Sequence, residues 1–592
     1  MADTDGDGLR DYSFSRRLGE AGVRSAAVDR DTWRLATGLK GLLGGWNYES
    51  YVAYGRTKET QNTSGQVNVQ NFRNAMQGVP DVNDLNHDGS SGDVICADAA
   101  ARAQGCAPLN LFGYNTMSPA ALAYVGVPTG LATSVTQKLV GGSLSGEWFE
   151  LPAGRIGVAA GVEWRGEASS SVPDALTQAG LNSGGQIAPV VGGFTVREAF
   201  VETRVPLLKD RQFARELSFL GALRLGRYST VGNASSWNAG LEWRPLADLK
   251  LRATRALSTR APNITELYAP ASQVFPTGIV DPCVGVTASS SGSYDAACRA
   301  APGVMDNIAA NGKFTQTQAD IQGLSGFNRG NTQLKAEQGR SSTVGLVLTP
   351  RSVPALRNLT LTVDYFDIKI GDAIVATPRQ YALQQCYGGG NSGFCQFATR
   401  RAAAASPYSA GSLSFLDSAV SNSGGTGTAG IDLTAAWAEQ LGPGRLSVRL
   451  AYTYLKDFYA IPLAGGARDS STGEVGFARN QAALNLGYQW GAFGVTTSTR
   501  YTGRSALDDQ FLAQFKLAPG ALGVGAKVVH DVQASYALRK TLALYLGVDN
   551  AFNSKPPPII SGLSGDTIGT ETNASVYDAI GRRFYLGLRG SL

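Results

Sequence analysis

Residues 445–454 read Arg-Leu-Ser-Val-Arg-Leu-Ala-Tyr-Thr-Tyr, and this stretch decides the fold class. Every second residue is apolar or aromatic, and the residues between are polar or small. A period of two is that of a β-strand, whose successive side chains point to opposite faces. The pattern recurs at 155–165 and 542–548. These runs of about ten residues predict strands that cross a bilayer between lipid and a wet lumen, because strands of soluble sandwiches are usually about half as long.

The composition supports the same class. The chain has 592 residues, of which 17% are charged, whereas about a quarter would be charged in a soluble protein. The mean hydropathy is nevertheless close to neutral, at -0.09. No apolar run reaches the roughly 18 residues of a membrane-spanning helix. Apolar content that is evenly diluted by polar residues is typical of a β-barrel in a membrane.

The connections between strands predict an orientation. Short connections near residues 44, 152, 442, 491 and 540 alternate with long segments, rich in Ser, Gly and Asn, at 59–136, 259–337 and 371–424. Outer-membrane barrels have short periplasmic turns and long extracellular loops. We therefore predict an all-β fold: a transmembrane, antiparallel, up-and-down β-barrel of about 18 strands, an even number, with long extracellular loops. It occupies residues 1–592 as a single domain, and its last strand is 583–592.

Five segments, in order, resemble elements of the TonB-dependent outer-membrane receptors. Four of them lie at 330–337, 363–368, 548–557 and 577–584. The most specific segment is similar to the family's R-A-P-x-x-x-E-L-Y signature, through Arg260, Ala261, Pro262, Asn263, Glu266, Leu267 and Tyr268. The resemblance extends from about residue 30 to the end of the chain.

This resemblance implies energised uptake of a scarce, bulky nutrient across the cell outer membrane. The substrate classes of the family are iron-siderophores, cobalamin and oligosaccharides. Its members have a 22-stranded barrel, an N-terminal plug and a short box that engages the TonB energy-coupling complex. We expect the present chain to hold about 18 of those strands without plug or box, and not to transport alone. The expected partners are outer-membrane lipid and, for the family, the TonB complex; the ligand is not predicted.

The sequence also leaves room for functions other than a receptor. A passive porin-like or adhesin barrel is the main alternative, and a secreted glycan-binding protein is another. An enzyme is not expected, because the chain has only two histidines, His87 and His530, and no G-x-S-x-G, H-E-x-x-H or P-loop. Nucleic acid is not an expected partner, because the net charge of +5 is not gathered into basic blocks.

Two sets of residues have both a structural and a functional interpretation. Arg260 and Glu266 could contact a substrate, but we prefer an ion pair that stiffens the exit from a strand into a loop. Loop aromatics could stack on a ligand or pack the loops against themselves. These aromatics are Phe112, Tyr114, Tyr294, Phe327, Tyr387 and Phe394.

The six cysteines form three local pairs, each within one long loop. Their spacing and an oxidising exterior predict three disulfides, each contributing about 2–3 kcal/mol of loop order. The predicted pairs are Cys96 with Cys106, Cys283 with Cys298, and Cys386 with Cys395.

Two acidic segments resemble the calcium loop D-x-[DN]-x-D-G. Their oxygen ligands are Asp3, Asp5, Asp7 and Asp11 in the first, and Asp84, Asn86, Asp88 and Asp93 in the second. The glutamate expected at the twelfth position is replaced by Phe14 and Ile95. The segments therefore predict either weak calcium binding, with a dissociation constant of about 10⁻⁴–10⁻³ M, or simply acidic turns. No other cofactor is expected.

Overall fold

A computed structural model describes residues 16, 18–87, 89–388, 392–463, 466–514, 517–559 and 572–590. Their main feature is one sheet of 20 strands. Three of these strands are short extensions into the loops, and the other seventeen form the wall. The wall strands are β1 (Ala26–Leu43), β2 (Trp46–Val67), β5 (Gly126–Leu151), β6 (Gly154–Pro173), β7 (Val190–Arg211), β8 (Ala214–Tyr228), β9 (Gly232–Leu246), β10 (Leu249–Arg260), β13 (Glu337–Leu348), β14 (Thr360–Ala376), β17 (Ser418–Leu441), β18 (Gly444–Ile461), β20 (Asn480–Trp490), β21 (Phe493–Thr502), β24 (Lys527–Arg539), β25 (Leu542–Asp549) and β26 (Arg583–Gly590).

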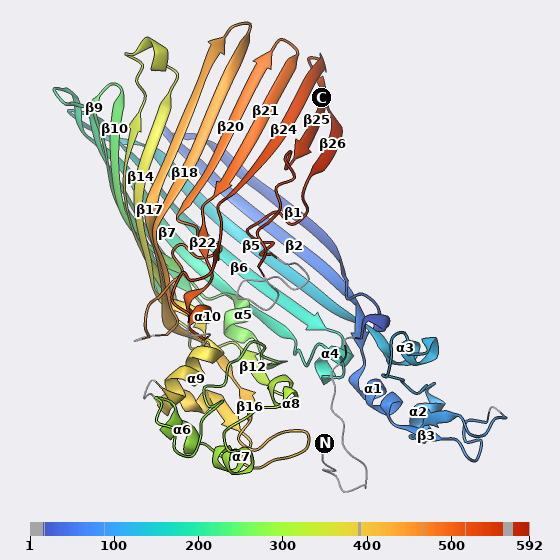
Figure 1. The fold of residues 1–592 in the computed structure, drawn as a ribbon. Coiled ribbons are helices and arrows are strands. Elements are labelled where there is room, and N and C mark those ends of the chain that lie inside the picture. Colours follow the sequence, from blue (N-terminus) through green and yellow to red (C-terminus); the bar gives the residue numbers. More distant parts are fainter. Residues whose placement is uncertain are drawn as a thin grey trace.

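Each wall strand pairs antiparallel with the wall strand before it and the one after it along the chain. This order is the predicted up-and-down meander, and it curls around a central space (Figure 1). We call one end of the wall the short-turn end, because it carries tight connections. An example is Gly44-Gly45, where both residues have positive φ. The opposite end, the long-loop end, carries most helices.

Many strands are longer than the predicted ten residues. The wall strand β5 has 26 residues and β17 has 24. The predicted loop 59–136 begins and ends inside β2 and β5, which stay paired as far as Val67 and Gly126. Serine, threonine and glutamine dominate these extensions, and such residues can pair in a hairpin that rises out of the membrane into water. The boundaries near 260 and 337 agree with the prediction.

The two edge strands of the wall run in the same direction. Both β1 and β26 start at the long-loop end and finish at the short-turn end, because the seventeen strands alternate and their number is odd. The described residues contain seventeen wall strands, which fits the predicted total of about 18. Across the described ranges no pairing joins β1 to β26, and these two strands could meet only in parallel.

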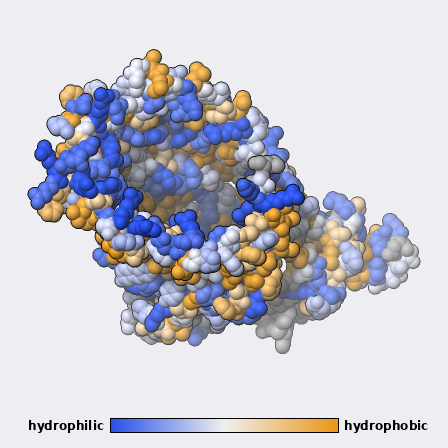
Figure 2. Space-filling view, turned by 90° about the horizontal axis from the view of Figure 1, so that it is seen from above, coloured by the Kyte–Doolittle hydropathy of each residue, from blue (hydrophilic) through white to orange (hydrophobic). Residues whose placement is uncertain are grey.

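The two faces of the wall differ as the alternation predicts. Val162 on β6 is 63% exposed and Val344 on β13 is 59% exposed, and both lie on the outward face. The residues that alternate with these outward residues along each strand, such as Glu163, face the central space. Viewed from the short-turn end, the sheet surrounds a hollow whose visible wall is largely hydrophilic (Figure 2). The outward face therefore suits lipid, and the lumen suits water.

The connections contain the remaining elements. The helices are α1 (Val69–Met76), α2 (Ala99–Ala103), α3 (Pro119–Val125), α4 (Ala175–Ala179), α5 (Ile264–Tyr268), α6 (Asp295–Arg299), α7 (Val304–Asn311), α8 (Gln318–Gln322), α9 (Arg379–Tyr387) and α10 (Asp509–Gln514), with 3-10 turns η1 (Gly19–Ala21), η2 (Pro354–Leu356) and η3 (Ser392–Phe397). The short strands are β3 (Gly78–Pro80), β4 (Val94–Cys96), β11 (Ser272–Val274), β12 (Gly326–Arg329), β15 (Ala398–Arg400), β16 (Leu413–Leu416), β19 (Asp469–Ser470), β22 (Ser505–Ala506) and β23 (Gly523–Val524). None of the helices in these ranges is long and apolar enough to cross a membrane.

Candidate functional site

Charged side chains line the lumen of the strands from β2 to β7. The hydroxyl of Tyr51 donates to a carboxylate oxygen of Glu163 at 2.7 Å. The guanidinium of Arg165 lies 3.6 Å from Glu163 and 3.2 Å from Glu167, two residues away on the same face of β6. Strand alternation brings these groups together, because residues two apart share a face. The wall therefore presents acidic and basic groups that neutralise one another.

The row of ion pairs continues along the neighbouring strands. The guanidinium of Arg204 lies 2.6 Å from Glu216 and 3.3 Å from Glu242. The ammonium group of Lys250 lies 2.9 Å from the same Glu242. Two of these contacts join adjacent strands, and the contact of Arg204 with Glu242 reaches from β7 across β8 to β9. The lumen surface is therefore a network of paired charges. Such a surface is hydrated and can exchange its hydrogen bonds with a polar solute that passes along it.

The segment with the R-A-P signature forms a clasp at the rim of the wall. Arg260, the last residue of β10, donates two hydrogen bonds of 3.0 Å to the carboxylate of Glu266. Its Nε donates a third, at 2.6 Å, to Glu337 at the start of β13. The predicted Arg260–Glu266 pair is present, and Glu337 was missed. The register of β10 with β13, in which these two residues are opposite, brings Glu337 into place.

Local chemistry shapes the rest of this clasp. The side chain of Asn263 accepts the N–H of Glu266 at 2.8 Å, and Glu266 accepts the N–H of Asn263 at 2.8 Å. These reciprocal bonds form a capping box, which starts helix α5. Pro262 is among the fully buried side chains of the chain, and Leu267 is 3% exposed. The geometry agrees with a rigid anchor between strand and loop.

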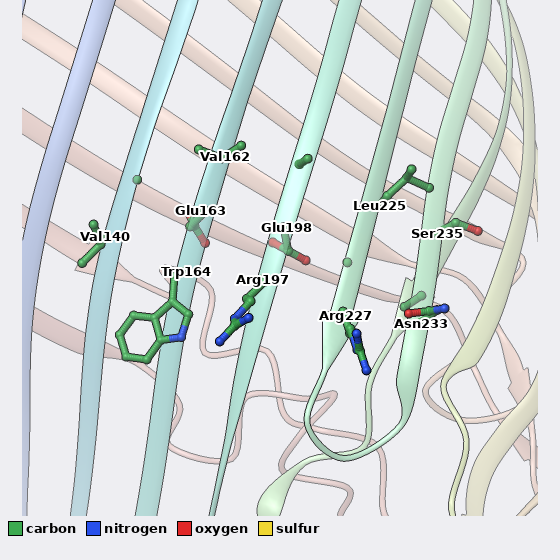
Figure 3. Close-up of a pocket in the computed structure, with 14 residues that line it drawn as sticks. Val140, Val162, Glu163, Trp164, Arg197, Glu198, Leu225, Arg227, Asn233 and Ser235 are labelled. Atoms are coloured by element: carbon green, nitrogen blue, oxygen red, sulfur yellow. The ribbon is translucent and has the colours of Figure 1, made fainter.

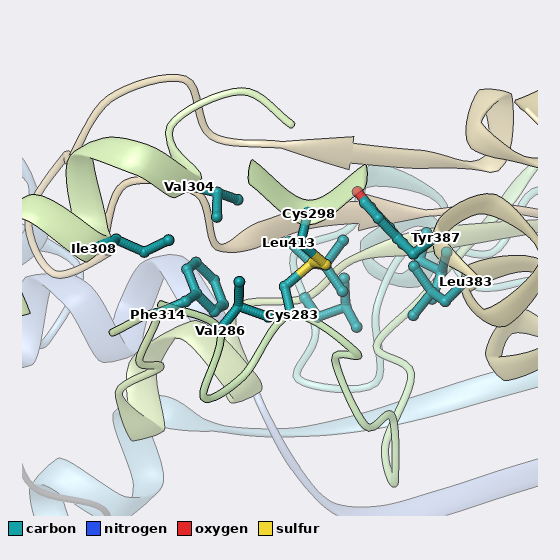
Figure 4. Packing of buried hydrophobic residues seen from close by; sticks show 11 residues of the cluster. Cys283, Val286, Cys298, Val304, Ile308, Phe314, Leu383, Tyr387 and Leu413 are labelled. Atoms are coloured by element: carbon teal, nitrogen blue, oxygen red, sulfur yellow. A yellow bond between two sulfur atoms is a disulfide. The ribbon is translucent and has the colours of Figure 1, made fainter. Parts of the chain in front are cut away.

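Two long loops beyond this clasp fold together at the long-loop end (Figure 1). We call residues 261–336 and 377–417 the loop unit. Its buried core takes Phe314 and Leu324 from the first loop and Leu383 and Leu416 from the second. Figure 4 shows the interlocking side chains around the disulfide of Cys283. The two loops are therefore one folded body, which the sequence patterns did not indicate.

A buried ion pair ties the two loops of this unit. The guanidinium of Arg400 lies 2.7 Å from Asp281, and both side chains are 1% exposed. Arg400 also donates to the hydroxyl of Tyr387 at 2.6 Å and lies over the ring of Phe314. Burial works to lower the pKa of Arg400, but the hydrogen bonds and charge of Asp281 raise it above its ordinary value. The guanidinium stays charged, and loss of Asp281 would leave that charge unpaired in the core.

The six cysteines form the three predicted disulfides, Cys96–Cys106, Cys283–Cys298 and Cys386–Cys395. The first lies in the connection from β2 to β5. The second disulfide lies in the first loop of the loop unit, and the third lies in its second loop. Each joins residues that are close in sequence, but both support the core that the two loops share.

Most of the loop aromatics pack the loops against themselves. Tyr387 is 8% exposed and Tyr294 lies against the same core. Phe327 packs edge-on against Phe415, and Phe394 packs edge-on against Tyr381. Phe112 and Tyr114, in the connection from β2 to β5, are instead 67% and 88% exposed. Exposure leaves the ring of Tyr114 available to a ligand.

The residues of the predicted calcium segments are only partly described. Asp3, Asp5, Asp7, Asp11 and Asp88 lie outside the described residues. Just before the second segment, the carboxylate of Asp81 accepts the N–H groups of Leu85 at 2.8 Å and Asn86 at 3.3 Å. Asn86 donates to Asp93 at 3.4 Å. Within the described ranges no group of three acidic, histidine or cysteine residues is placed to hold a metal, and calcium binding stays a prediction.

The meander, the hydrophilic lumen and the apolar outward face define a class, the transmembrane β-barrels of the outer membrane. A family model described as "TonB dependent receptor-like, beta-barrel" matches residues 2–551. The chain belongs to this family of outer-membrane receptors, as its motifs indicated. No curated protein matches the chain in sequence.

Solved structures share the fold at low sequence identity. The siderophore receptor PirA from Acinetobacter baumannii is 14% identical with a TM-score of 0.53, covering 96% of this chain and 63% of its own. A mutant of the ferric enterobactin receptor PfeA from Pseudomonas aeruginosa is 15% identical with a TM-score of 0.54, covering 96% and 62%. The outer-membrane transporter YddB from Escherichia coli is 10% identical with a TM-score of 0.51, covering 96% and 63%. The chain thus spans less than two thirds of these proteins.

Proposed function

We propose that this chain supplies the barrel of a receptor that takes up a bulky, scarce nutrient, such as an iron-siderophore, cobalamin or an oligosaccharide. The observation that carries the proposal is a lumen lined with paired charges below a folded loop unit. A passive pore needs only a hydrated lumen. The loop unit contains a buried ion pair and two disulfides, so it presents a rigid outer surface. A receptor that captures its ligand requires such a surface. The receptor binds and moves its ligand and does not transform it.

Energy for uptake comes, in this proposal, from the TonB complex of the inner membrane. The support for this energy source is that the chain belongs to the family, and not a contact within the described residues. The edges of the wall also affect whether the chain can be active alone. An edge that faces lipid leaves backbone groups unsatisfied at several kcal/mol each. Within the described residues, β26 and β1 run in the same direction and cannot form an antiparallel closing pair. We therefore propose that the chain by itself does not support uptake.

Growth tests distinguish the two proposals: uptake of the nutrient by the receptor, and the lack of uptake by the chain alone. A strain that lacks its own receptors is grown on a limiting iron-siderophore, cobalamin or oligosaccharide, with either this chain alone or this chain expressed as part of a full-length receptor of the family. We expect growth only with the full-length receptor, and only in cells that contain TonB. Growth with the chain alone would contradict the second proposal. Growth that is independent of TonB, together with leakage of unrelated small solutes, would favour the passive pore over the receptor.

A further inference from the structure

Two arginines lie directly opposite each other on the outward face of neighbouring strands. Arg197 of β7 and Arg227 of β8 are partners in the sheet register. Side chains at such positions have Cβ atoms about 5 Å apart, and like charges there destabilise the pair. Both residues are exposed, and neither makes a salt bridge with any part of the chain that the structure describes. The arrangement is unfavourable unless an anion neutralises it.

Arginines on the lumenal face of β6, β7 and β8 have acidic partners. Arg165, Arg204 and Arg224 each lie within 3.3 Å of a glutamate. On the outward face, the residues in register beside the two unpaired arginines are Trp164 on β6 and Asn233 on β9. Neither carries a negative charge. The wall therefore supplies counter-charges inside but none at this outward position, so the anion must come from outside the protein.

A groove of about 750 Å³ lies beside this arginine pair. Its outward lining includes Val162 and Leu225, which are 63% and 55% exposed. Figure 3 shows Trp164, Arg197 and Arg227 at the same end of the groove, on three successive strands. The groove thus combines an apolar floor with a cationic end.

The cationic end lies at the border of the apolar band. On β8 the outward residues from Leu217 to Leu225 are apolar or glycine, and Arg227 follows at the next outward position. Eight residues of a tilted strand span roughly 20 Å, close to the roughly 25 Å height of the lipid-facing band of outer-membrane barrels. Trp164 occupies the level at which aromatic side chains meet the headgroups. Arg227 and Arg197 therefore stand at headgroup depth on the extracellular side.

We propose that Arg197 and Arg227 together bind the phosphate of a lipid headgroup in the outer leaflet, with an acyl chain of that lipid along the groove. A guanidinium donates two parallel hydrogen bonds to phosphate oxygens, so one phosphate can accept from both arginines and remove their repulsion. A free phosphate ion would satisfy the charge but would leave Val162 and Leu225 without a partner. The combination of charge and apolar floor favours the lipid.

The test measures binding of two matched lipids to the full chain in a neutral detergent. The probes are phosphatidic acid and diacylglycerol with the same acyl chains, followed by native mass spectrometry. We expect wild type to prefer the phosphorylated lipid. The double variant Arg197→Gln/Arg227→Gln should lose about tenfold or more of that preference, because hydrogen bonds to charged groups contribute more than 1.4 kcal/mol. An unchanged preference in this variant would overturn the proposal.

Two further variants make the result specific. Arg215→Gln removes an exposed arginine on the same face of β8, near its short-turn end, and should keep the preference; an equal loss would show that only total charge matters and would overturn the proposal. Arg227→Glu places a carboxylate opposite Arg197, which should stabilise the strand pair while abolishing the preference. A preference that survives Arg227→Glu would contradict the site. Displacement of phosphatidic acid by inorganic phosphate at equal concentration would contradict the choice of a lipid.

Discussion

The wall and the loop unit are held together by different physics. In β1 every residue except Gly41 is exposed, and the strand is ordered by its backbone pairing with β2. In the loop unit, Phe314 and Leu383 are fully buried, as in a small soluble domain. The wall relies on hydrogen-bonded ladders and on the bilayer as its solvent. The loop unit relies on apolar burial and cross-links, and we expect substitutions in the two regions to have effects of different size.

The largest effect should come from the buried ion pair of the loop unit. Asp281→Ala leaves the Arg400 guanidinium buried without its partner, which costs about 3–5 kcal/mol. Hydrogen exchange of the full chain should show loss of protection across both loops, with the wall unchanged. Arg357→Ala is the matched control, because Arg357 is 62% exposed and its pair with Glu439 is at the surface. Equal effects of the two substitutions would contradict a separately stabilised loop unit.

The next largest effect should come from a disulfide. Replacing Cys283 and Cys298 by serine opens a 15-residue loop, and the loop-entropy model gives about 3 kcal/mol for that length. Protection should fall in both loops of the loop unit, since they share one core. The corresponding Cys96→Ser/Cys106→Ser variant should lower protection only between β2 and β5. A loss confined to residues 283–298 in the first variant would show that the core does not couple the loops.

The clasp at the rim should give a smaller effect, since it lies between the two regions. Arg260→Lys removes the planar fork that reaches Glu266 and Glu337 together. Arg260 is partly exposed, so we expect about 1 kcal/mol or less, seen as faster exchange around α5. Uptake by the whole receptor should change little. Loss of uptake with unchanged exchange would instead favour a substrate contact for Arg260.

The smallest effect should be a dependence on pH in the connection between β18 and β20. Burial raises the pKa of Glu474 to about 7, assisted by Asp508 and Asp509. A raised carboxyl pKa means that the fold favours the neutral form, so local stability is full below the ordinary pKa and falls as pH rises towards 7. Protection near Glu474, taken as the exchange rate corrected for its base-catalysed intrinsic rise with pH, should therefore fall between about pH 5 and 7. Glu474→Gln should remove this dependence, and a persistent dependence would exclude Glu474 as its source.

The sequence by itself determined the membrane-spanning wall. Its period of two placed apolar residues towards lipid and polar ones towards the lumen, and its short connections placed the turns, because both depend on neighbouring residues only. Local spacing was also sufficient for the three disulfides and for the Arg260–Glu266 pair. The family motifs added the class of receptor.

The tertiary structure alone decided which distant residues meet. Glu337 reaches Arg260 across 77 positions of sequence, and Asp281 meets Arg400 across 119. The opposition of Arg197 and Arg227 depends on the register of β7 with β8, where a shift of one residue would turn one arginine into the lumen. Periodicity shows which face a residue occupies but not which partner lies beside it, because register and loop packing are set by contacts between segments that are far apart in the chain.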